Sequence, residues 1–226
     1  SAFDRPNEDV NHAFNVLVDS GEVAVVAKKN KLTKVKIKPG RPLKLMLAVL
    51  SKSVAEGFSA VGSPAAIEQK YDGFRMAVHN DGKEILLFTR NMENITKQFP
   101  DVVENVKKFV NAKKYIIDCE AVGYDPKTKK YLPFQKISQR IKRKYGTDEM
   151  AEKFPVEVNA FDLISCEGED LTETNFADRR KLLKKIIKQT KKKVVLSELE
   201  ITDDEKKVEK FFKKSIKEGH EGIMFK

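Results

Sequence analysis

The sequence predicts an α+β fold with mainly antiparallel sheets flanked by helices. Several short stretches alternate apolar and polar residues with the two-residue period of a strand, whereas others repeat at helical intervals. Asp81-Gly82 stands between two predicted strands and is a typical hairpin signal. Helices and hairpin-linked strands interleave without the strict alternation of a doubly wound fold, so we expect antiparallel pairing to dominate.

The N-terminal part predicts a helical piece followed by a linker. Apolar residues recur at helical intervals through the first thirty residues, with Gly21 as a break. Residues 31–42 alternate apolar side chains with lysines and contain a Pro-Gly pair, which predicts a linker or a short strand. We therefore divide the chain into residues 1–38 and residues 39–226. The helical piece is too short to be expected to form a core of its own.

The second part of the chain carries the remaining predicted elements. Short apolar or alternating runs predict strands at residues 64–70, 74–80, 83–90, 115–125, 156–164 and 221–226. We also predict helices at residues 99–112, at residues 134–144, which are basic, and at residues 176–193, whose apolar residues lie on one side and whose opposite face is cationic. A further lysine-rich helix is predicted before the last strand.

Composition narrows the class of protein. The net charge of +10 attracts polyanions, of which nucleic acid is the usual one. Cys119 and Cys166 form no C-x-x-C pair, so a reducing compartment is expected. Neither common glycine-rich phosphate loop occurs in the sequence. No apolar run approaches membrane-spanning length, so we expect a soluble protein with no membrane partner.

Residues 68–75, EQKYDGFR, contain a candidate nucleophile. An apolar run ends at Lys70, and Asp72 and Gly73 follow directly. A lysine attacks only when its amine is deprotonated and held in place. A strand that ends in a turn with a solvated lysine would give the same octet, so K-x-D-G alone is a weak motif.

Four further side chains stand where site residues could be. Glu120 lies in an apolar strand with Asp118 on the same face, and a carboxylate there needs a cation, a metal or a hydrogen-bond donor. Phe161 fits a core aromatic best, although a ring at a strand end can also stack on a base. Arg90 ends a predicted strand, where a solvated arginine is the alternative, and Glu221 precedes a short strand, where a turn residue is the alternative.

The order and spacing of these stretches resemble motifs I to IV of the covalent nucleotidyltransferases, and specifically the ATP-dependent DNA ligases. The matching stretches are EQKYDGFR, LLFTRN, DCEAVGYD, VNAFDLI and EGIMFK. GRPLKLMLA and RRKLLKKI resemble the segment before motif I and the connecting helix of the archaeal and eukaryotic replicative type. The resemblance covers essentially the whole chain and implies the ATP-grasp-like nucleotidyltransferase fold of a ligase adenylation domain.

The resemblance also implies a role for each matching residue. Lys70 would attack the α-phosphate of ATP, expel pyrophosphate and carry AMP as lysyl-AMP. The implied nucleotide-binding residues are Glu68 at the adenine, Arg75 and Arg90 at ribose and phosphate, Glu120 at ribose and metal, and Phe161 stacked on the base; Glu221 is the second implied metal ligand. The expected cofactors are ATP and Mg²⁺, which takes oxygen ligands and keeps several waters.

For the whole protein, the resemblance implies DNA ligation. AMP would pass from the lysine to the 5′-phosphate of a nick in double-stranded DNA, and the 3′-OH would then seal it. The end of a DNA-encircling N-terminal domain is implied for residues 1–38, with a sliding clamp as a further partner. A monomer is expected, cytoplasmic in an archaeon or nuclear in a eukaryote. Because motif V and an OB-fold would follow Lys226, we expect residues 1–226 alone to adenylate weakly or not at all.

Two alternative functions remain open at this point. RNA ligases and mRNA-capping guanylyltransferases share the K-x-D-G lysine, although PLKLMLA and LLFTRN favour a DNA ligase. The second alternative is a basic nucleic-acid-binding module without catalysis, supported by the net charge of +10 and by two basic helices. Such a module predicts salt-sensitive DNA binding that does not depend on Lys70.

Overall fold

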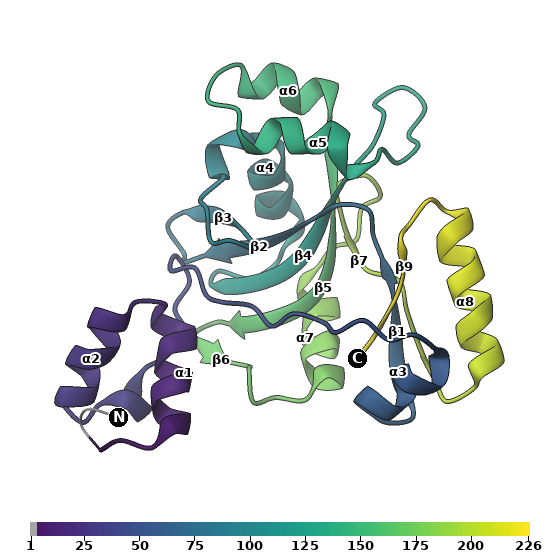
Figure 1. Cartoon of the computed structure of the whole chain (residues 1–226). Coiled ribbons are helices and arrows are strands. Elements are labelled where there is room, and N and C mark those ends of the chain that lie inside the picture. The colour runs from purple at the N-terminus through teal and green to yellow at the C-terminus, as the bar shows by residue number, and fades with distance from the viewer. Residues whose placement is uncertain (1–3) are drawn as a thin grey trace.

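Two sheets form the framework of the computed structural model, which describes residues 4–226 (Figure 1). The six-stranded sheet has the order β3 (Ile85–Thr89), β2 (Phe74–Asn80), β4 (Tyr115–Gly123), β5 (Val156–Cys166) and β6 (Glu169–Asp170), with β7 (Val194–Leu196) beside β5. The three-stranded sheet has the order β8 (Leu199–Thr202), β1 (Ala65–Lys70) and β9 (Gly222–Phe225). Within the described residues, every strand pair is antiparallel except β5 with β7, which confirms the predicted fold class.

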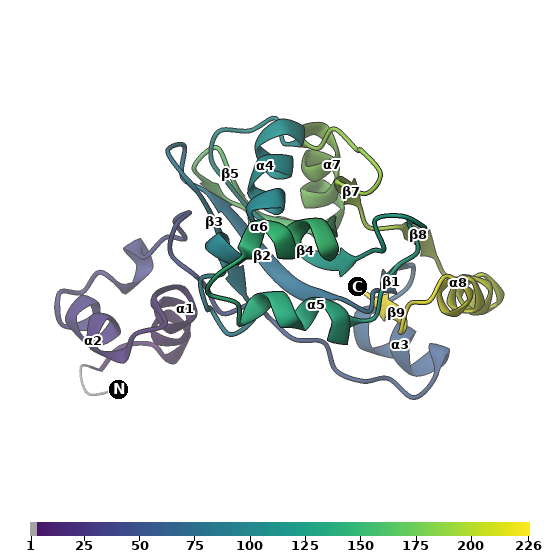
Figure 2. The ribbon, with the colours of Figure 1, turned by 90° about the horizontal axis from the view of Figure 1, so that it is seen from above.

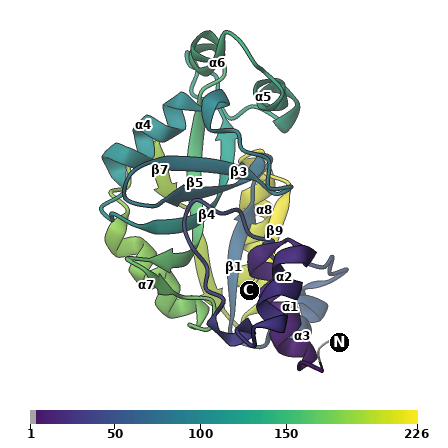
Figure 3. The ribbon, with the colours of Figure 1, turned by 90° about the vertical axis from the view of Figure 1, so that its left-hand side faces the viewer.

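Helices cover the outer faces of both sheets. The helices of the six-stranded sheet are α4 (Pro100–Phe109) and α7 (Phe176–Ile186), and those of the three-stranded sheet are α3 (Val54–Val61) and α8 (Glu205–Lys217). Figure 3 shows α4 and α7 on one side of the six-stranded sheet and the three-stranded sheet on the other. At the end of the sheet seen from above in Figure 2, α5 (Phe134–Ile141) packs beside β4, and α6 (Thr147–Lys153) packs against α4 and α5.

The main apolar core lies between the six-stranded sheet and α4 and α7. Val106 of α4 and Leu183 of α7 are buried there against strand residues such as Met76. α4 begins with Pro100, whose missing N–H costs nothing at a helix start, and ends with lysines beside the negative end of the helix dipole. No helix among residues 4–226 has the length and apolar character needed to cross a membrane.

The predicted hairpin between β2 and β3 is confirmed. Gly82 has a φ of +92°, a left-handed conformation that glycine adopts without strain. The Asp81 carboxylate accepts hydrogen bonds from the backbone N–H groups of Lys83 (2.8 Å) and Glu84 (2.9 Å). These bonds close the turn and set the strand register.

The N-terminal stretch differs from the prediction in detail. Its first three residues lie outside the described part, and the rest forms α1 (Asn7–Leu17), α2 (Ser20–Lys28) and a 3₁₀ helix, η1 (Leu32–Lys34). The helix break falls at Val18, with a φ of +53°, and not at Gly21, which lies inside α2. Residues 31–42 contain no strand. Contrary to expectation, α1, α2 and η1 bury a small apolar cluster of their own, which consists of Ala13, Val23, Ala27 and Leu32.

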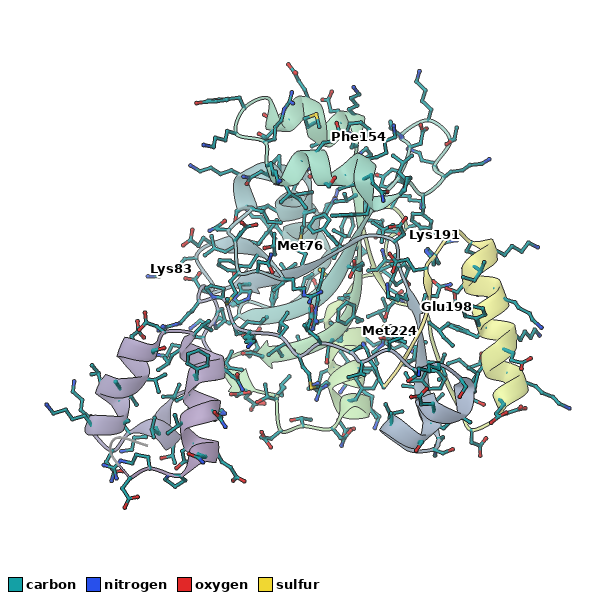
Figure 4. The ribbon with its side chains drawn as sticks, viewed as in Figure 1. Met76, Lys83, Phe154, Lys191, Glu198 and Met224 are labelled. Atoms are coloured by element: carbon teal, nitrogen blue, oxygen red, sulfur yellow. The ribbon has the colours of Figure 1, made fainter. Side chains whose placement is uncertain are left out.

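Three other differences from the prediction concern the second part of the chain. α3 and α6 have no counterpart in the prediction. α7 ends at Ile186, before the predicted residue 193, because Ile187 takes an extended conformation and bridges to Val110. After β7, the chain crosses from the six-stranded to the three-stranded sheet at Ser197 and Glu198. Glu198 lies beside α8, where it pairs with Lys214 (Figure 4).

Candidate active site

Lys70 ends β1 and is held by the neighbouring strand. Its backbone C=O accepts a hydrogen bond of 2.8 Å from the N–H of Glu221, just before β9. Its ammonium group forms an ion pair with the Glu221 carboxylate, and the side chains are 48% and 45% exposed. The amine is therefore accessible to a substrate and at the same time held by a carboxylate.

The turn after Lys70 explains the other residues of the motif. A Cβ atom at Gly73 would lie 2.6 Å from the backbone oxygen of Ala121 and 2.9 Å from Cγ of Glu120. Only glycine therefore lets this turn approach β4 so closely. The Asp72 carboxylate accepts the N–H of Phe134 at 3.3 Å, which fixes the start of α5.

Arg75 and Glu120 lie side by side on the sheet face that borders Lys70. They are directly opposite each other in the register of β2 and β4. The Arg75 guanidinium donates to both carboxylate oxygens of Asp118, with Nε–Oδ1 at 3.0 Å and Nη2–Oδ2 at 2.5 Å, and to the backbone oxygen of Met46 at 2.7 Å. Because Asp118 is only 2% exposed, this bidentate pair holds Arg75 in one orientation.

The environment of Glu120 suits a cation. Burial, the largest cause, and the Asp118 charge raise the pKa of Glu120 to about 8, although Arg75 and Lys70 act in the opposite direction. Within residues 4–226, no group of three or more histidine, cysteine or acidic side chains could hold a metal ion. Mg²⁺ needs only one or two protein carboxylates, because substrate phosphates and water complete its coordination, so Glu120 and Glu221 stay predicted ligands for it.

A β-bulge places Phe161 in the site. Asp118 pairs with Asp162 and Cys119 pairs with Ala160, so Phe161 has no partner across the ladder. Bulges re-aim side chains in this way. The ring centroid lies 5.7 Å from the guanidinium carbon of Arg75 and 4.3 Å from Nζ of Lys226. The Phe161 ring therefore lies near two cations and does not belong to the main apolar core.

Glu68 lies within a cluster of donors that the sequence did not reveal. The side chain of Glu68 is 3% exposed and accepts hydrogen bonds from Ser197 Oγ (2.7 Å) and Arg180 Nη1 (3.2 Å). Lys226 forms an ion pair with its second oxygen. A signal for Arg180 was present, because Arg179 and Arg180 are the arginines in a helix whose other cations are lysines. Arginine is the usual partner of buried carboxylates.

Arg90 is the one predicted site residue that the structure leaves apart. It follows the last residue pair of the β2–β3 ladder, Met76 with Thr89, and so lies at the same end of the sheet as Arg75. Its side chain is exposed and makes no hydrogen bond or ion pair to the part of the chain that the structure describes. The other six predicted site residues are linked to one another. Lys70 pairs with Glu221, and Arg75 lies beside both Glu120 and Phe161. Glu68 and Phe161 share the ammonium group of Lys226 as a neighbour.

The chain is similar to DNA ligases along its whole length. Residues 45–226 match the family described as the ATP dependent DNA ligase domain. The DNA ligase of Nanoarchaeum equitans is 47% identical over 228 residues, which cover 100% of this chain and 40% of that protein. For the DNA ligase of Methanopyrus kandleri the identity is 40% over 228 residues, with 100% and 41% covered. The chain thus spans about two fifths of the length of these relatives.

Solved ligase structures share the fold. The ligase domain of M. tuberculosis LigD superposes with a TM-score of 0.55 and 27% identity, over 78% of this chain and 52% of that one. A mycobacterial DNA ligase D complexed with ATP and MES gives a TM-score of 0.52 and 27% identity, over 74% and 49%. The expected ligase adenylation fold is confirmed. This chain belongs to the ATP dependent DNA ligase domain family.

Proposed function

We propose that this chain is the catalytic core of an ATP-dependent DNA ligase in which Lys70 carries AMP. Nζ of Lys70 loses a proton and attacks the α-phosphorus of ATP. A P–N bond forms, the bond from the α-phosphorus to the bridging oxygen breaks, and pyrophosphate departs. The observation that carries this proposal is the half-exposed Lys70, paired with Glu221 at the junction of the two sheets.

The residues around Lys70 supply the rest of the proposed site. The adenine would stack on Phe161 and meet Glu68, while Arg75 would contact the ribose or the phosphates. Glu120 and Glu221 would hold Mg²⁺, which would neutralise the charge that develops on the phosphates. Arg90 is proposed to contribute from the rim of the site.

For the whole protein we propose nick sealing in double-stranded DNA. The named relatives are DNA ligases, and a net charge of +10 favours binding to the phosphate backbone. Transfer of AMP to the 5′-phosphate and attack by the 3′-OH would complete the reaction. The boundary between residues 1–38 and 39–226, the sliding clamp, the monomeric state and the cellular compartment stay predictions.

Adduct formation tests the proposal directly. The full-length protein is incubated with ATP and Mg²⁺, its intact mass is measured, and the modified peptide is mapped. We expect one AMP on Lys70 and none in Lys70→Ala or Lys70→Arg, because a guanidinium stays protonated. Lys83→Arg, at the tip of the hairpin, serves as the control and should retain the adduct. An adduct on another lysine contradicts the assignment.

The same assay separates the alternatives. A guanylyltransferase would form its adduct from GTP, whereas we expect ATP to be preferred. A non-catalytic binding module would form no adduct and would bind DNA equally well after Lys70→Ala. Salt-sensitive DNA binding without an adduct in the full-length protein would therefore favour that module.

A further inference from the structure

One guanidinium connects the two halves of the proposed base pocket. Nη1 of Arg180 lies 3.2 Å from Glu68 Oε1, 3.3 Å from the backbone oxygen of Phe161 and 3.2 Å from that of Ala160. It also lies 2.9 Å from Ser197 Oγ, and Nη2 donates to the backbone oxygen of Ser197. The Arg180 side chain is only 12% exposed.

These contacts join segments that are far apart in the chain. Glu68 is on β1 of the three-stranded sheet, and Phe161 is on β5 of the six-stranded sheet. Ser197 lies where the chain crosses between these sheets. Arginine presents five N–H donors in a rigid plane, whereas lysine has one point of attachment on a flexible stem. A lysine at position 180 could therefore not make the same set of contacts.

The two oxygens of Glu68 have different partners. Oε1 accepts hydrogen bonds from Arg180 Nη1 and Ser197 Oγ, which both lie in the protein's interior. Oε2 forms an ion pair with Lys226, whose ammonium group also lies 4.3 Å from the centre of the Phe161 ring. A base stacked on Phe161 would take the place of this ammonium group. Oε2 is then the oxygen that meets the edge of the base.

We propose that Arg180 is a positioning residue that determines base specificity. It fixes Glu68 and the backbone of Phe161 so that Oε2 accepts a hydrogen bond from the 6-amino group of a purine. A 6-oxo purine presents an acceptor at that place, and two facing acceptors repel each other. This inference rests on the proposed function, in which the nucleotide binds at Glu68 and Phe161.

Inosine triphosphate provides the test, because it carries an oxo group where ATP carries the amino group. The full-length protein is assayed for lysyl-adduct formation with each nucleotide. We expect Arg180→Lys to reduce the preference for ATP by about tenfold, the effect of losing one hydrogen bond to a charged group. The loss should fall on KM for ATP, with kcat much less affected, because Arg180 touches no reacting atom.

A double-variant cycle separates positioning from structural damage. Glu68→Gln should lower the preference by itself, and adding Arg180→Lys should then change it little, since both act through one carboxylate. Ser197→Ala should also lower the preference for ATP, by a smaller factor. This variant replaces Arg180→Lys in the test if Arg180→Lys does not fold. Lys181→Gln, on the same helix and 73% exposed, should leave the preference unchanged.

A second buried arginine controls for stability. Arg140 is fully buried and binds Asp101, so Arg140→Lys should lower the melting temperature without changing the preference. Equilibrium binding of both nucleotides to Lys70→Ala measures the preference without chemistry. If Lys70→Ala still binds ATP in preference to inosine triphosphate but the wild-type protein forms no adduct, the proposed catalytic role of Lys70 is rejected and the inference about Arg180 is not. If Arg180→Lys weakens both nucleotides equally, Arg180 is merely structural and the inference is wrong.

Discussion

The rings of Tyr71 and His220 pack edge to face, with centroids 4.7 Å apart and an interplanar angle of 69°. Tyr71 follows Lys70 in the chain, and His220 precedes Glu221. The contact therefore joins the chain neighbours of the proposed nucleophile and of its carboxylate partner. Tyr131 also packs against His220, with ring centroids 5.5 Å apart.

Removal of the His220 ring should slow adduct formation on Lys70. We expect His220→Ala to reduce the single-turnover rate by about tenfold, because small displacements of reacting groups are costly. His220→Phe should retain most of the rate, since the ring contact is preserved. If His220→Phe is as slow as His220→Ala, the imidazole itself is needed and the packing explanation is wrong.

Much of the local structure could be predicted from the sequence. Alternating apolar and polar residues predicted β2, β3 and β5, and Asp81-Gly82 predicted the hairpin between β2 and β3. These features depend on residues that are neighbours in the chain, so the sequence alone reveals them. A start signal for α3 was also present, because Ser53 and Glu56 have the S-x-x-E spacing of a capping box. Ser53 Oγ accepts the N–H of Glu56 at 3.2 Å, and the Glu56 carboxylate accepts the N–H of Lys52 at 2.6 Å. The prediction passed over this signal.

The rest depends on contacts between distant segments. Arg180 and Glu68 are 112 positions apart, and no spacing in the sequence relates them. Residues 194–202 form two strands and not one, because β7 pairs in the six-stranded sheet and β8 pairs in the three-stranded sheet. The chain crosses between the two sheets at Ser197 and Glu198. The motifs identified the candidate residues of the site, whereas the donors around Glu68 emerged only from the packed structure.

Buried His79 should make the protein less stable in acid. Its Nδ1 accepts the N–H of Gly40 at 3.3 Å, its Nε2 has no partner among the described residues, and burial lowers its pKa to about 4. The unfolded chain takes up a proton near pH 6.5, so this contribution is fully present above 6.5 and is lost as pH falls through 4.

Between pH 7 and pH 4.5, His79 should therefore account for a loss of about 2–3 kcal/mol in unfolding free energy. Urea titrations at both pH values measure this loss. His79→Gln keeps an acceptor for Gly40 and does not titrate, so its loss over the same range should be smaller by that amount. Equal losses in the two proteins would show that His79 is not the titrating group.

Substitution of Gly73 should disturb the nucleophile through the backbone. Gly73→Ala places a methyl group 2.6 Å from the backbone oxygen of Ala121, so the turn or β4 must move. We expect a loss of about 1–3 kcal/mol in stability and a slower adduct on Lys70. Denaturant unfolding and single-turnover assays measure the two effects. Unchanged values for both would mean that the turn has room for a side chain.

The buried pair of Arg75 with Asp118 should matter far more for stability than a surface pair. Asp118→Asn removes the charge that balances Arg75 at a position only 2% exposed, so we expect a loss of about 3–5 kcal/mol. Lys181→Gln breaks the exposed pair with Asp178 and should cost no more than about 0.5 kcal/mol. Asp118→Asn should also weaken ATP binding, because Arg75 is then free to turn away from the proposed phosphate position. Urea unfolding and calorimetric titration with ATP test both effects, and a stable Asp118→Asn protein with normal ATP affinity would refute this account of Arg75.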